Sequence, residues 1–273
     1  MSGPDEQQSP PPDRGEEAHW QAFLANPDSM MGVGRRLFSR LPANPRCRLC
    51  AAPFGGAGGA VMRTIGKKQS GANPNMCTSC EKQLLNRRGG AEVDTTTLFA
   101  DIRGSTALGE RMSPSDFRAT LNRYYTVASD VVYEHGGIVD KFVGDELVAA
   151  FPPFLGADHA RRAVAAATAL LRRTGHGDPD GPWVPVGAGV HTGRVWFGTI
   201  GEGNHVEITV IGDVVNTTAR LASAAESGEV LVSYYAAQAA GLDDTDLEHR
   251  SLELKGKEAS TDVVSVRIAS PPR

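Results

Sequence analysis

The residues best placed for chemistry in this sequence are two aspartates that each follow an apolar stretch. Asp101 comes directly after the β-branched and apolar run at 95–100 and opens a turn rich in small residues. Asp145 lies in a two-residue Gly-Asp link between the apolar runs 137–143 and 146–151. Such a link is typical of a type II′ hairpin, so we expect the second carboxylate at a hairpin tip.

The two carboxylates are predicted to lie side by side. A strand, a helix and a hairpin in succession usually place the hairpin next to the first strand, because sequential elements pair and crossovers are right-handed. Two carboxylates at adjacent strand ends, beside a turn with free N–H groups, suit one or two Mg²⁺ ions that carry a polyphosphate. Either aspartate alone would be ordinary turn chemistry, so the pair gains meaning from the motifs downstream.

The four cysteines form two CxxC pairs, Cys47 with Cys50 and Cys77 with Cys80. Four thiolates at this spacing suit a tetrahedral Zn²⁺ ion. The glycine-rich segment between the pairs has little to pack, so a structural metal would supply folding free energy that a core cannot. A redox dithiol pair and disulfides are the alternatives.

Composition favours one good-sized core and a small module, since 40% of the 273 residues are hydrophobic. The net charge of −4 gives no general reason to expect nucleic acid or an anionic membrane as partner. No apolar run reaches the roughly eighteen residues of a membrane span, and the first residues lack the features of a signal peptide. We therefore expect a soluble, cytoplasmic protein.

Basic residues gather around the cysteines, with eight Lys and Arg against one acid in residues 41–90. This excess raises the question of nucleic-acid binding. A four-thiolate zinc centre carries a charge of about −2, however, which basic neighbours offset, and no aromatic side chains are interleaved with them. We expect nucleic acid not to be a partner.

Three regions are expected along the chain. Residues 1–19 hold four prolines and five acids with almost nothing to bury, which is typical of disorder. Residues 20–90 should form a helical entry segment and the zinc module, and residues 91–273 a larger α+β domain. A short helix couples the module to that domain, so the module either braces its entry or lets a regulator act through it.

Periodicity and capping signals predict the elements of the larger domain. Ser113 and Asp116 flank a proline in a capping box that should open a helix. Asn216 and Arg220 stand four positions apart on another expected helix, so both can reach one ligand, although a solvated surface pair is the alternative. The remaining expected elements are a helix at 159–173 and strands at 183–190, 195–197, 205–211, 229–233 and 262–268.

Four stretches resemble, in order, the motifs of class III nucleotidyl cyclases. They are residues 99–106 (FADIRGST), 141–145 (KFVGD), 189–195 (GVHTGRV) and 212–220 (GDVVNTTAR). The resemblance extends over about residues 94–268 and leaves the cysteine module outside. It implies a ferredoxin-like βαββαβ domain that converts a nucleoside triphosphate to a cyclic nucleotide and pyrophosphate.

The resemblance also implies a role for each motif residue. Asp101, Asp145 and the backbone of Ile102 would hold two Mg²⁺ or Mn²⁺ ions, one lowering the pKa of the ribose 3′-OH and one clamping the phosphates. Asn216 would orient the ribose, and Arg220 would stabilise charge at the α-phosphate. The phosphate oxygens would be bound by the backbone at Ile102, Gly104, Ser105 and Thr106 and by the side chain of Arg194.

Two positions that select the base in this family match Lys141 and Thr209. A Lys donor at adenine N1 and a hydroxyl that accepts from N6 fit ATP, whereas guanine N1–H would face Lys141 donor to donor. Unpaired groups of this kind cost about 1–3 kcal/mol each. A threonine at 209 resembles the subgroup that includes bicarbonate-responsive cyclases, and its hydroxyl discriminates less sharply than an aspartate would.

Members of the family work as head-to-tail pairs, and this chain holds one full set of the residues from both sides. We therefore expect a homodimer with two equivalent sites. Three alternatives remain for the activity: a guanylate cyclase; a diguanylate cyclase, because the sequence Gly144-Asp145-Glu146 is faintly similar to the GGDEF turn; and a nucleotide sensor or zinc-dependent interaction protein without catalysis.

Overall fold

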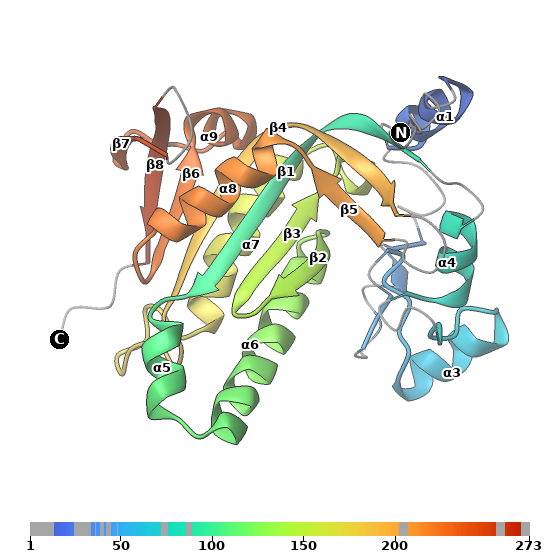
Figure 1. Cartoon of the computed structure of the whole chain (residues 1–273), viewed down its shortest axis with the longest axis horizontal. Helices are drawn as coiled ribbons and strands as arrows, with labels where there is room; N and C mark the ends of the chain where they lie inside the picture. Colours follow the sequence, from blue (N-terminus) through green and yellow to red (C-terminus); the bar gives the residue numbers. More distant parts are fainter. Residues whose placement is uncertain are drawn as a thin grey trace, which may run out of the picture.

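The structure is a computed structural model in which one mixed sheet carries helices on both faces (Figure 1). The expected disorder of residues 1–13 lies outside the described residues, whereas residues 14–19 are helical, which corrects the expectation for them. Within the described part of the chain, no helix is both long and apolar enough to cross a membrane. The described residues are 14–24, 34–35, 37–38, 41, 45–47, 49–71, 76–85, 89–201, 207–254 and 260–268.

Eight strands form the sheet within these ranges, in the order β2-β3-β1-β4-β6-β8-β7, with β5 paired to β4. All neighbouring strands are antiparallel except β4 and β6. The strands are β1 (Gly90–Ile102), β2 (Ile138–Val143), β3 (Glu146–Phe151), β4 (Val186–Ile200), β5 (Glu207–Ile211), β6 (Glu229–Ser233), β7 (Glu248–Leu252) and β8 (Thr261–Arg267).

The predicted βαββαβ unit is present. Helix α6 (Pro114–Glu134) connects β1 to β2, and helix α7 (His159–Arg173) connects β3 to β4. The resulting order β2-β3-β1-β4, with each neighbour antiparallel, is ferredoxin-like. As expected, Ser113 caps α6 by accepting a hydrogen bond from the backbone N–H of Asp116. The α+β fold class is therefore confirmed.

The largest apolar core lies on the face of the sheet that α6, α7 and α9 (Tyr234–Ala240) cover. Leu98 and Ala100 of β1 point into this core, whereas Phe99 packs on the opposite face against Ala222 of helix α8 (Asp213–Ala224). Side chains alternate along a strand, so Asp101 projects toward the same face as Phe99. The acid at the end of β1 thus shares its face with α8.

Strand β4 is one continuous strand of 15 residues, which corrects the expectation of two separate strands at 183–190 and 195–197. Its glycines serve close packing instead. A Cβ on Gly189 would lie 2.3 Å from the backbone nitrogen of Ala222, and one on Gly193 would lie 2.8 Å from a methyl carbon of Val214. Because both neighbours belong to α8, the glycines let this helix dock directly on the strand.

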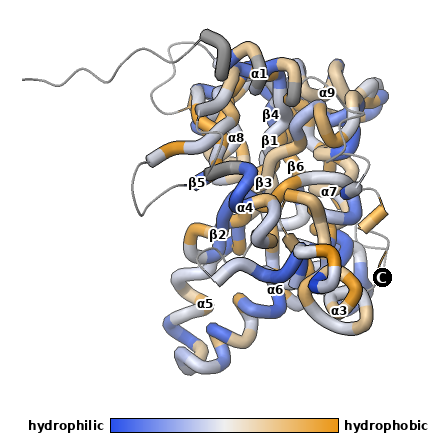
Figure 2. Tube along the Cα trace, turned by 90° about the vertical axis from the view of Figure 1, so that its right-hand side faces the viewer, coloured by the Kyte–Doolittle hydropathy of each residue, from blue (hydrophilic) through white to orange (hydrophobic). Residues whose placement is uncertain are grey.

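The N-terminal part packs against one edge of the sheet face that also carries α8. It contains helices α1 (Arg14–Leu24), α3 (Gly56–Thr64) and α4 (Thr78–Leu85), of which α3 and α4 lie beyond β2 and β5 (Figure 1). Helix α3 occupies the glycine-rich segment that was expected to pack little. Figure 2 looks at the molecule from this side, and the exposed Val61 and Ile65 belong to the hydrophobic stretch of α3 and its end.

One apolar cluster joins the N-terminal part to the sheet. It unites Trp20, Leu24 and the four cysteines with Phe197 of β4 and Val210 of β5. Arg35 adds a buried polar link, because its Nη1 donates to the carbonyl of Leu49 at 2.6 Å and its Nη2 donates to the carbonyl of Gly137, just before β2. The cysteine module therefore shares a core with the larger domain.

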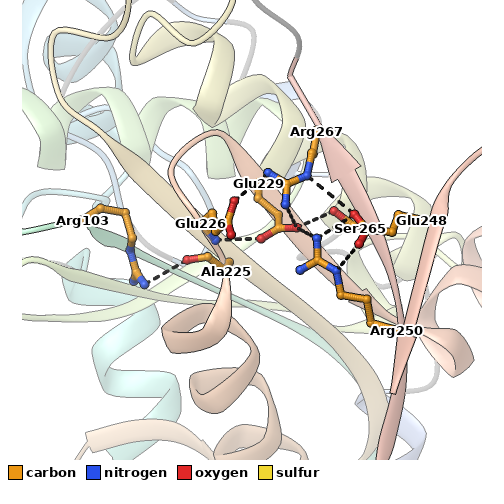
Figure 3. Close-up of polar contacts among 8 residues, drawn as sticks. All are labelled: Arg103, Ala225, Glu226, Glu229, Glu248, Arg250, Ser265 and Arg267. Carbon is orange, nitrogen blue, oxygen red and sulfur yellow. Dashed lines mark hydrogen bonds and ion pairs between the residues drawn. The ribbon is translucent and has the colours of Figure 1, made fainter. Parts of the chain in front are cut away.

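A buried carboxylate connects the three strands at the far edge of the sheet (Figure 3). Glu229 of β6 is fully buried and accepts hydrogen bonds from the backbone N–H of Glu226 at 2.7 Å and from the hydroxyl of Ser265 in β8. Arg250 of β7 and Arg267 of β8 pair with it at 2.8 Å and 3.1 Å. This network compensates the buried charge and fixes β7 against β8.

Candidate active site

The sheet register brings the two predicted acids to the same end of neighbouring strands. Ala100 of β1 pairs with Leu147 of β3, so Asp101 stands opposite Glu146, the residue that follows Asp145. Gly144 has φ +60°, and among the described non-glycine residues only Ala51 has a positive φ, so the link has the backbone signs of a type II′ turn. The Asp145 tip therefore lies beside the end of β1.

Helix α6 holds this hairpin tip in place. The hydroxyl of Tyr125 donates to the carbonyl of Gly144, and its ring stacks on Phe142 at a centroid distance of 4.0 Å. Burial and the charge of Asp145 raise the pKa of Glu146. They also raise the pKa of Tyr124, whose hydroxyl donates to the carbonyl of Ala100 at 2.9 Å. The charge of Asp145 thus influences the ionisation of both Glu146 and Tyr124.

Arg103 pairs with one of the two acids and lies within the electrostatic field of the other. Its guanidinium forms an ion pair with the Asp101 carboxylate, and although burial lowers the pKa of Arg103, the charge of Asp145 opposes that shift. The buried Oδ1 atom of Asp101 is the atom that pairs with Nη2 of Arg103. A buried carboxylate oxygen that attracts a cation fits a site for hard divalent ions.

The same guanidinium reaches across to α8. Arg103 donates to the carbonyls of Ser223 and Ala225 at 3.0 Å and 3.1 Å, as Figure 3 shows for Ala225. Thr97 and Thr218 share a second hydrogen bond between β1 and α8 at 2.6 Å. These contacts align the last turn of α8 with the acid end of β1.

The small-residue turn after Asp101 leads into a helix that the sequence patterns did not predict, α5 (Ser105–Arg111). Gly104 precedes it in the left-handed conformation, with φ +68°, and a Cβ at this position would meet no atom within 4 Å. The first backbone N–H groups of a helix have no partner inside it. Gly104, Ser105 and Thr106 can therefore present backbone donors, whereas Ile102 is the last residue of β1, and the phosphate cradle stays a prediction.

The two predicted base-reading residues meet through a third side chain. Thr209 of β5 donates its hydroxyl hydrogen to Oδ2 of Asp140 at 2.8 Å, and Nζ of Lys141 lies 3.6 Å from the same oxygen. Lys141 also lies 3.9 Å from a carboxylate oxygen of Glu207. Strand β2 and strand β5 thus place a donor and a hydroxyl side by side.

Asn216 and Arg220 project from α8, where neither side chain has a hydrogen-bond or ion-pair partner among the described residues. Their helix is fixed by the opposite face, since Val214, Thr218 and Leu221 are buried against the sheet. An amide and a guanidinium without partners within the chain can both bind a ligand. The helix therefore offers them to a partner outside the described fold.

Arg194 lies far along the sheet from the two acids of its own chain. It pairs across the sheet with Asp94, seven positions before Asp101 on β1, and its Nε donates to Glu92 at 2.9 Å. Seven strand residues span about 23 Å. Within one chain the strand therefore separates Arg194 from that turn, and its expected role at the phosphate oxygens stays a prediction.

The four cysteines come together as predicted. Their Sγ atoms all lie within 4.8 Å of one another, all four side chains are buried, and none forms a disulfide. The Sγ atoms of Cys50 and Cys77 are 3.8 Å apart. A tetrahedral ion with Zn–S bonds of about 2.3 Å sets its sulfurs about 3.8 Å apart, so the cluster fits zinc. Hydrogen bonds from the other three thiols lower the pKa of Cys47.

Three residues of these sites were not predicted from the sequence: Arg103, Asp140 and Arg35. Arg103 and Asp140 each stand next to a predicted residue, but an adjacent residue on a regular strand points to the other face. A register shift between Val139 and Lys141 breaks that alternation in β2. Such a bulge carries no dependable sequence signal, and no local pattern marks Arg35.

Several known proteins are similar to this chain in fold and in sequence. A family profile for the adenylate and guanylate cyclase catalytic domain matches residues 91–265. The crystal structure of the guanylyl cyclase Cya2 is 31% identical with a TM-score of 0.58, and it covers 67% of this chain and 96% of that one. The adenylyl cyclase CyaB from P. aeruginosa is 27% identical with a TM-score of 0.57 and covers 67% and 97%.

Curated relatives are longer than this chain. An adenylate cyclase of Anabaena cylindrica is 34% identical over 137 residues, which is 46% of this chain and 26% of that protein. A terminal-differentiation specific adenylate cyclase of Dictyostelium discoideum is 30% identical over 179 residues, or 63% of this chain and 8% of that protein. The profile match and the matching structures together show that this chain belongs to the family of adenylate and guanylate cyclase catalytic domains.

Proposed function

We propose that this chain is an adenylate cyclase, a phosphorus–oxygen lyase that converts ATP to 3′,5′-cyclic AMP and pyrophosphate. The observation that carries the proposal is the meeting of Lys141 and Thr209 beside Asp140, while Asp101 and Asp145 share one end of the sheet. The first group reads the base and the second holds the triphosphate. A guanylate cyclase is the second candidate, because the guanylyl cyclase Cya2 is 31% identical.

The reaction follows from the residues of the two groups. Asp101, Asp145 and the backbone of Ile102 would hold two Mg²⁺ or Mn²⁺ ions, which when bound would supply charge neutralisation of the phosphates and a lower pKa of the ribose 3′-OH. Backbone donors of the turn at Gly104, Ser105 and Thr106 bind phosphate oxygens. The 3′-OH loses its proton to solvent and its oxygen bonds to the α-phosphorus, while the bond from the α-phosphorus to the bridging oxygen breaks and pyrophosphate leaves.

Helix α8 supplies the remaining groups. Asn216 accepts or donates hydrogen bonds at the ribose and so orients the attacking hydroxyl toward the α-phosphorus. Arg220 stabilises the charge that develops on the α-phosphate in the transition state. Both side chains are free of competing partners among the described residues, which leaves them available to a nucleotide.

Lys141 and Thr209 would choose adenine over guanine. Lys141 donates to the N1 acceptor of adenine, and the Thr209 hydroxyl accepts from the N6 amino group. We place the chain in the threonine-containing subgroup on this basis, for which activation by bicarbonate is a hypothesis to test in the same assay.

The test is an assay of the purified chain with Mn²⁺ and either ATP or GTP, with the products separated by chromatography. Cyclic AMP from ATP at a several-fold higher kcat/KM than cyclic GMP from GTP supports the proposal. A preference for GTP would establish the guanylate alternative, cyclic di-GMP the diguanylate alternative, and the absence of turnover a non-catalytic nucleotide-binding role.

We also propose that the active chain is a homodimer whose sites are shared. Within one chain, α8 brings its last turn to Arg103, whereas Arg194 lies about 23 Å along β1 from Asp101. One chain therefore does not assemble every predicted phosphate-binding side chain at its own acids. Two antiparallel copies would let the acids of one chain face Asn216 and Arg220 of the other.

Mixing two inactive variants tests this arrangement. Asp101→Ala and Asn216→Ala should each reduce kcat at least about a hundredfold, because each removes a group from both sites of a homodimer. After chain exchange, half of the dimers are mixed and hold one intact site, so activity should return to roughly a quarter of the normal value. A mixture that stays inactive after exchange, confirmed with differently tagged chains, would refute the shared site.

We further propose that Cys47, Cys50, Cys77 and Cys80 hold one structural zinc ion and that the protein works in the cytoplasm. The fit of the sulfur positions to a tetrahedral ion supports the metal. Unbonded cysteines are usual for a reducing compartment, which supports the location. The shared core makes the module a place where a regulator could act on the catalytic domain.

A further inference from the structure

The position of Asp140 gives Thr209 a property that a threonine does not have by itself. A free hydroxyl can donate or accept, so it can pair with the N6 amino group of adenine or with the O6 oxygen of guanine. In this structure the Thr209 hydroxyl donates a hydrogen bond to Oδ2 of Asp140, with 2.8 Å between the two oxygens. An ionised carboxylate only accepts, so this bond commits the hydrogen and leaves the lone pairs of Thr209 for a ligand.

The backbone fixes Asp140 in that role. Strand β2 has a register shift between Val139 and Lys141, and Asp140 is the residue at the shift. A bulge of this kind turns a side chain away from its regular direction. The Asp140 side chain is only 7% exposed, so its carboxylate is held against β5 and does not sample the solvent freely.

The same oxygen also orders the second base-reading group. Nζ of Lys141 lies 3.6 Å from Oδ2 of Asp140, close enough for electrostatic attraction, while its side chain stays 43% exposed. The ammonium group is therefore drawn toward Thr209 and keeps hydrogens for a ligand. One carboxylate oxygen thus sets a donor and an acceptor side by side, which is the pattern that adenine N1 and N6 require.

We propose that Asp140 is the residue that determines nucleotide preference, by fixing the direction of the Thr209 hydroxyl. The proposal deepens the proposed adenylate cyclase function and rests on it. Asp140 does not touch the nucleotide in this scheme and acts through Thr209, so it is a positioning residue. Guanine is disfavoured because its O6 acceptor meets the lone pairs of Thr209 and its N1–H meets Lys141.

Two substitutions at Asp140 separate hydrogen-bond direction from charge. Asp140→Leu removes the acceptor and keeps the branched shape of the side chain, although leucine is larger, so the Thr209 hydroxyl can turn and donate to guanine. We expect the ratio of kcat/KM for GTP to that for ATP to rise about tenfold, the effect of satisfying one polar group. Asp140→Asn keeps an oxygen that can accept from Thr209 and should retain most of the ATP preference, although it also removes the charge.

A double-mutant cycle with Thr209→Val shows whether the effect passes through the hydroxyl. Asp140→Leu should leave the GTP-to-ATP ratio unchanged when Thr209 is already valine. Asp180→Asn, an exposed carboxylate in the loop before β4, is the matched control and should change neither rate. A uniform loss of both activities in Asp140→Leu with an unchanged ratio, or equal effects of Leu and Asn, would overturn the proposal.

Binding measurements keep this test independent of turnover. 3′-Deoxy-ATP and 3′-deoxy-GTP lack the attacking hydroxyl, so their dissociation constants can be measured on the full chain without reaction. The unaltered chain should bind the adenine compound more tightly. Asp140→Leu should lower the ratio of the dissociation constant for 3′-deoxy-GTP to that for 3′-deoxy-ATP about tenfold. Asp140→Ala serves in the same measurement if the leucine variant does not fold.

The two proposals fail in different ways. An unaltered chain that makes no cyclic nucleotide, yet shows the expected change of binding ratio, contradicts the proposed function alone. If the chain makes cyclic AMP, and Asp140→Leu leaves the GTP-to-ATP ratio of kcat/KM unchanged, this inference alone is contradicted. Equal or tighter binding of the guanine compound to the unaltered chain overturns the assignment of Thr209 as an acceptor.

Discussion

His176 is a buried histidine whose hydrogen bond requires a neutral ring. Its Nε2 accepts from the backbone N–H of Val186 at 3.0 Å, at the start of β4, and its side chain is buried. Burial lowers the pKa of His176. A protonated ring would have no lone pair for Val186, so the folded state binds the proton less readily than the unfolded chain does.

This difference predicts a loss of stability in acid. The free energy of unfolding rises with pH wherever the unfolded chain binds more protons, so the contribution is complete above the unfolded pKa of about 6.5 and falls as the pH drops below it. Urea unfolding between pH 7.5 and 5.5 should show that the free energy of unfolding falls as the pH falls. His176→Gln should reduce the slope of this free energy against pH by at most about 1.4 kcal/mol per pH unit. His249→Gln, at an exposed site, is the control, and an equal slope in both variants would contradict the assignment.

At this scale the sequence indicated which residues carry chemistry better than it indicated how they are held. Asp101 and Asp145 were placed at adjacent strand ends from strand and turn signals alone, and the register of β1 and β3 agrees. The position of Arg194 along β4, opposite Asp94, could not be predicted because a motif gives a residue's type and not its distance along a strand. Asp140 and Arg103 depend on a bulge and on cross-sheet contacts, which are set by tertiary packing.

Gly189 shows how tightly two elements meet. A Cβ at this position would lie 2.3 Å from the backbone nitrogen of Ala222, so Gly189→Ala must push α8 away from β4. Backbone atoms cannot rotate aside as a side chain can, and we expect a loss of about 3 kcal/mol in the free energy of unfolding, measured in urea. Because the displaced helix carries Asn216 and Arg220, kcat should fall as well.

Gly71→Ala is the control for this effect. Gly71 is exposed, its φ is not in the left-handed region, and a Cβ there would meet no atom within 4 Å. The free energy of unfolding should change by less than about 0.5 kcal/mol. A Gly189→Ala variant as stable as this control would show that α8 does not dock on β4 as described.

Element prediction succeeded where a single local signal decided the outcome. The cap at Ser113, the hairpin at Gly144 and the helix at 159–173 were all found from local residues. The sequence predicted two strands where β4 is continuous, and the glycines at 189 and 193 make room for a helix from another part of the chain. Helix α5 was missed because its short sequence holds a glycine and no apolar face long enough to show a period.

On the scale of the whole molecule, the cysteine cluster belongs to a core that also holds parts of β4 and β5. Loss of the proposed zinc should therefore destabilise the catalytic domain and not the module alone. Cys80→Ser should lower zinc content from about one ion per chain and lower the unfolding midpoint by roughly 10 °C, as expected for several kcal/mol of lost metal-coupled free energy. Atomic emission spectroscopy and thermal unfolding measure the two quantities.

Ser79→Ala provides the matched control, because Ser79 lies between the two cysteines of its pair and donates one hydrogen bond to the carbonyl of Gly66. Zinc content should stay the same and the midpoint should shift by only a few degrees. If freshly reduced, unaltered protein carries no zinc, or if Cys80→Ser loses zinc without loss of stability, the structural role of the metal is wrong.

The joining of module and domain was beyond the reach of sequence patterns. The apolar residues near Trp20 predicted that this segment docks, but its partner is a surface built by β1 and the turn Pro153–Leu155 after β3. Such a surface arises only when strands distant in the chain are assembled. The division of the chain at residue 90 was therefore reasonable as a motif boundary, and the shared core crosses it.

The buried guanidinium of Arg35 has a practical consequence for anyone who trims this protein to its recognisable part. A fragment that starts at residue 91 keeps every side chain proposed to meet the nucleotide, yet it strips the apolar cover from Phe197 and Val210 and removes the donor to the carbonyl that precedes β2. Such a fragment would expose an apolar surface to solvent and aggregate. A lack of cyclase activity in such a fragment would then result from aggregation and would not show that the catalytic residues are inactive.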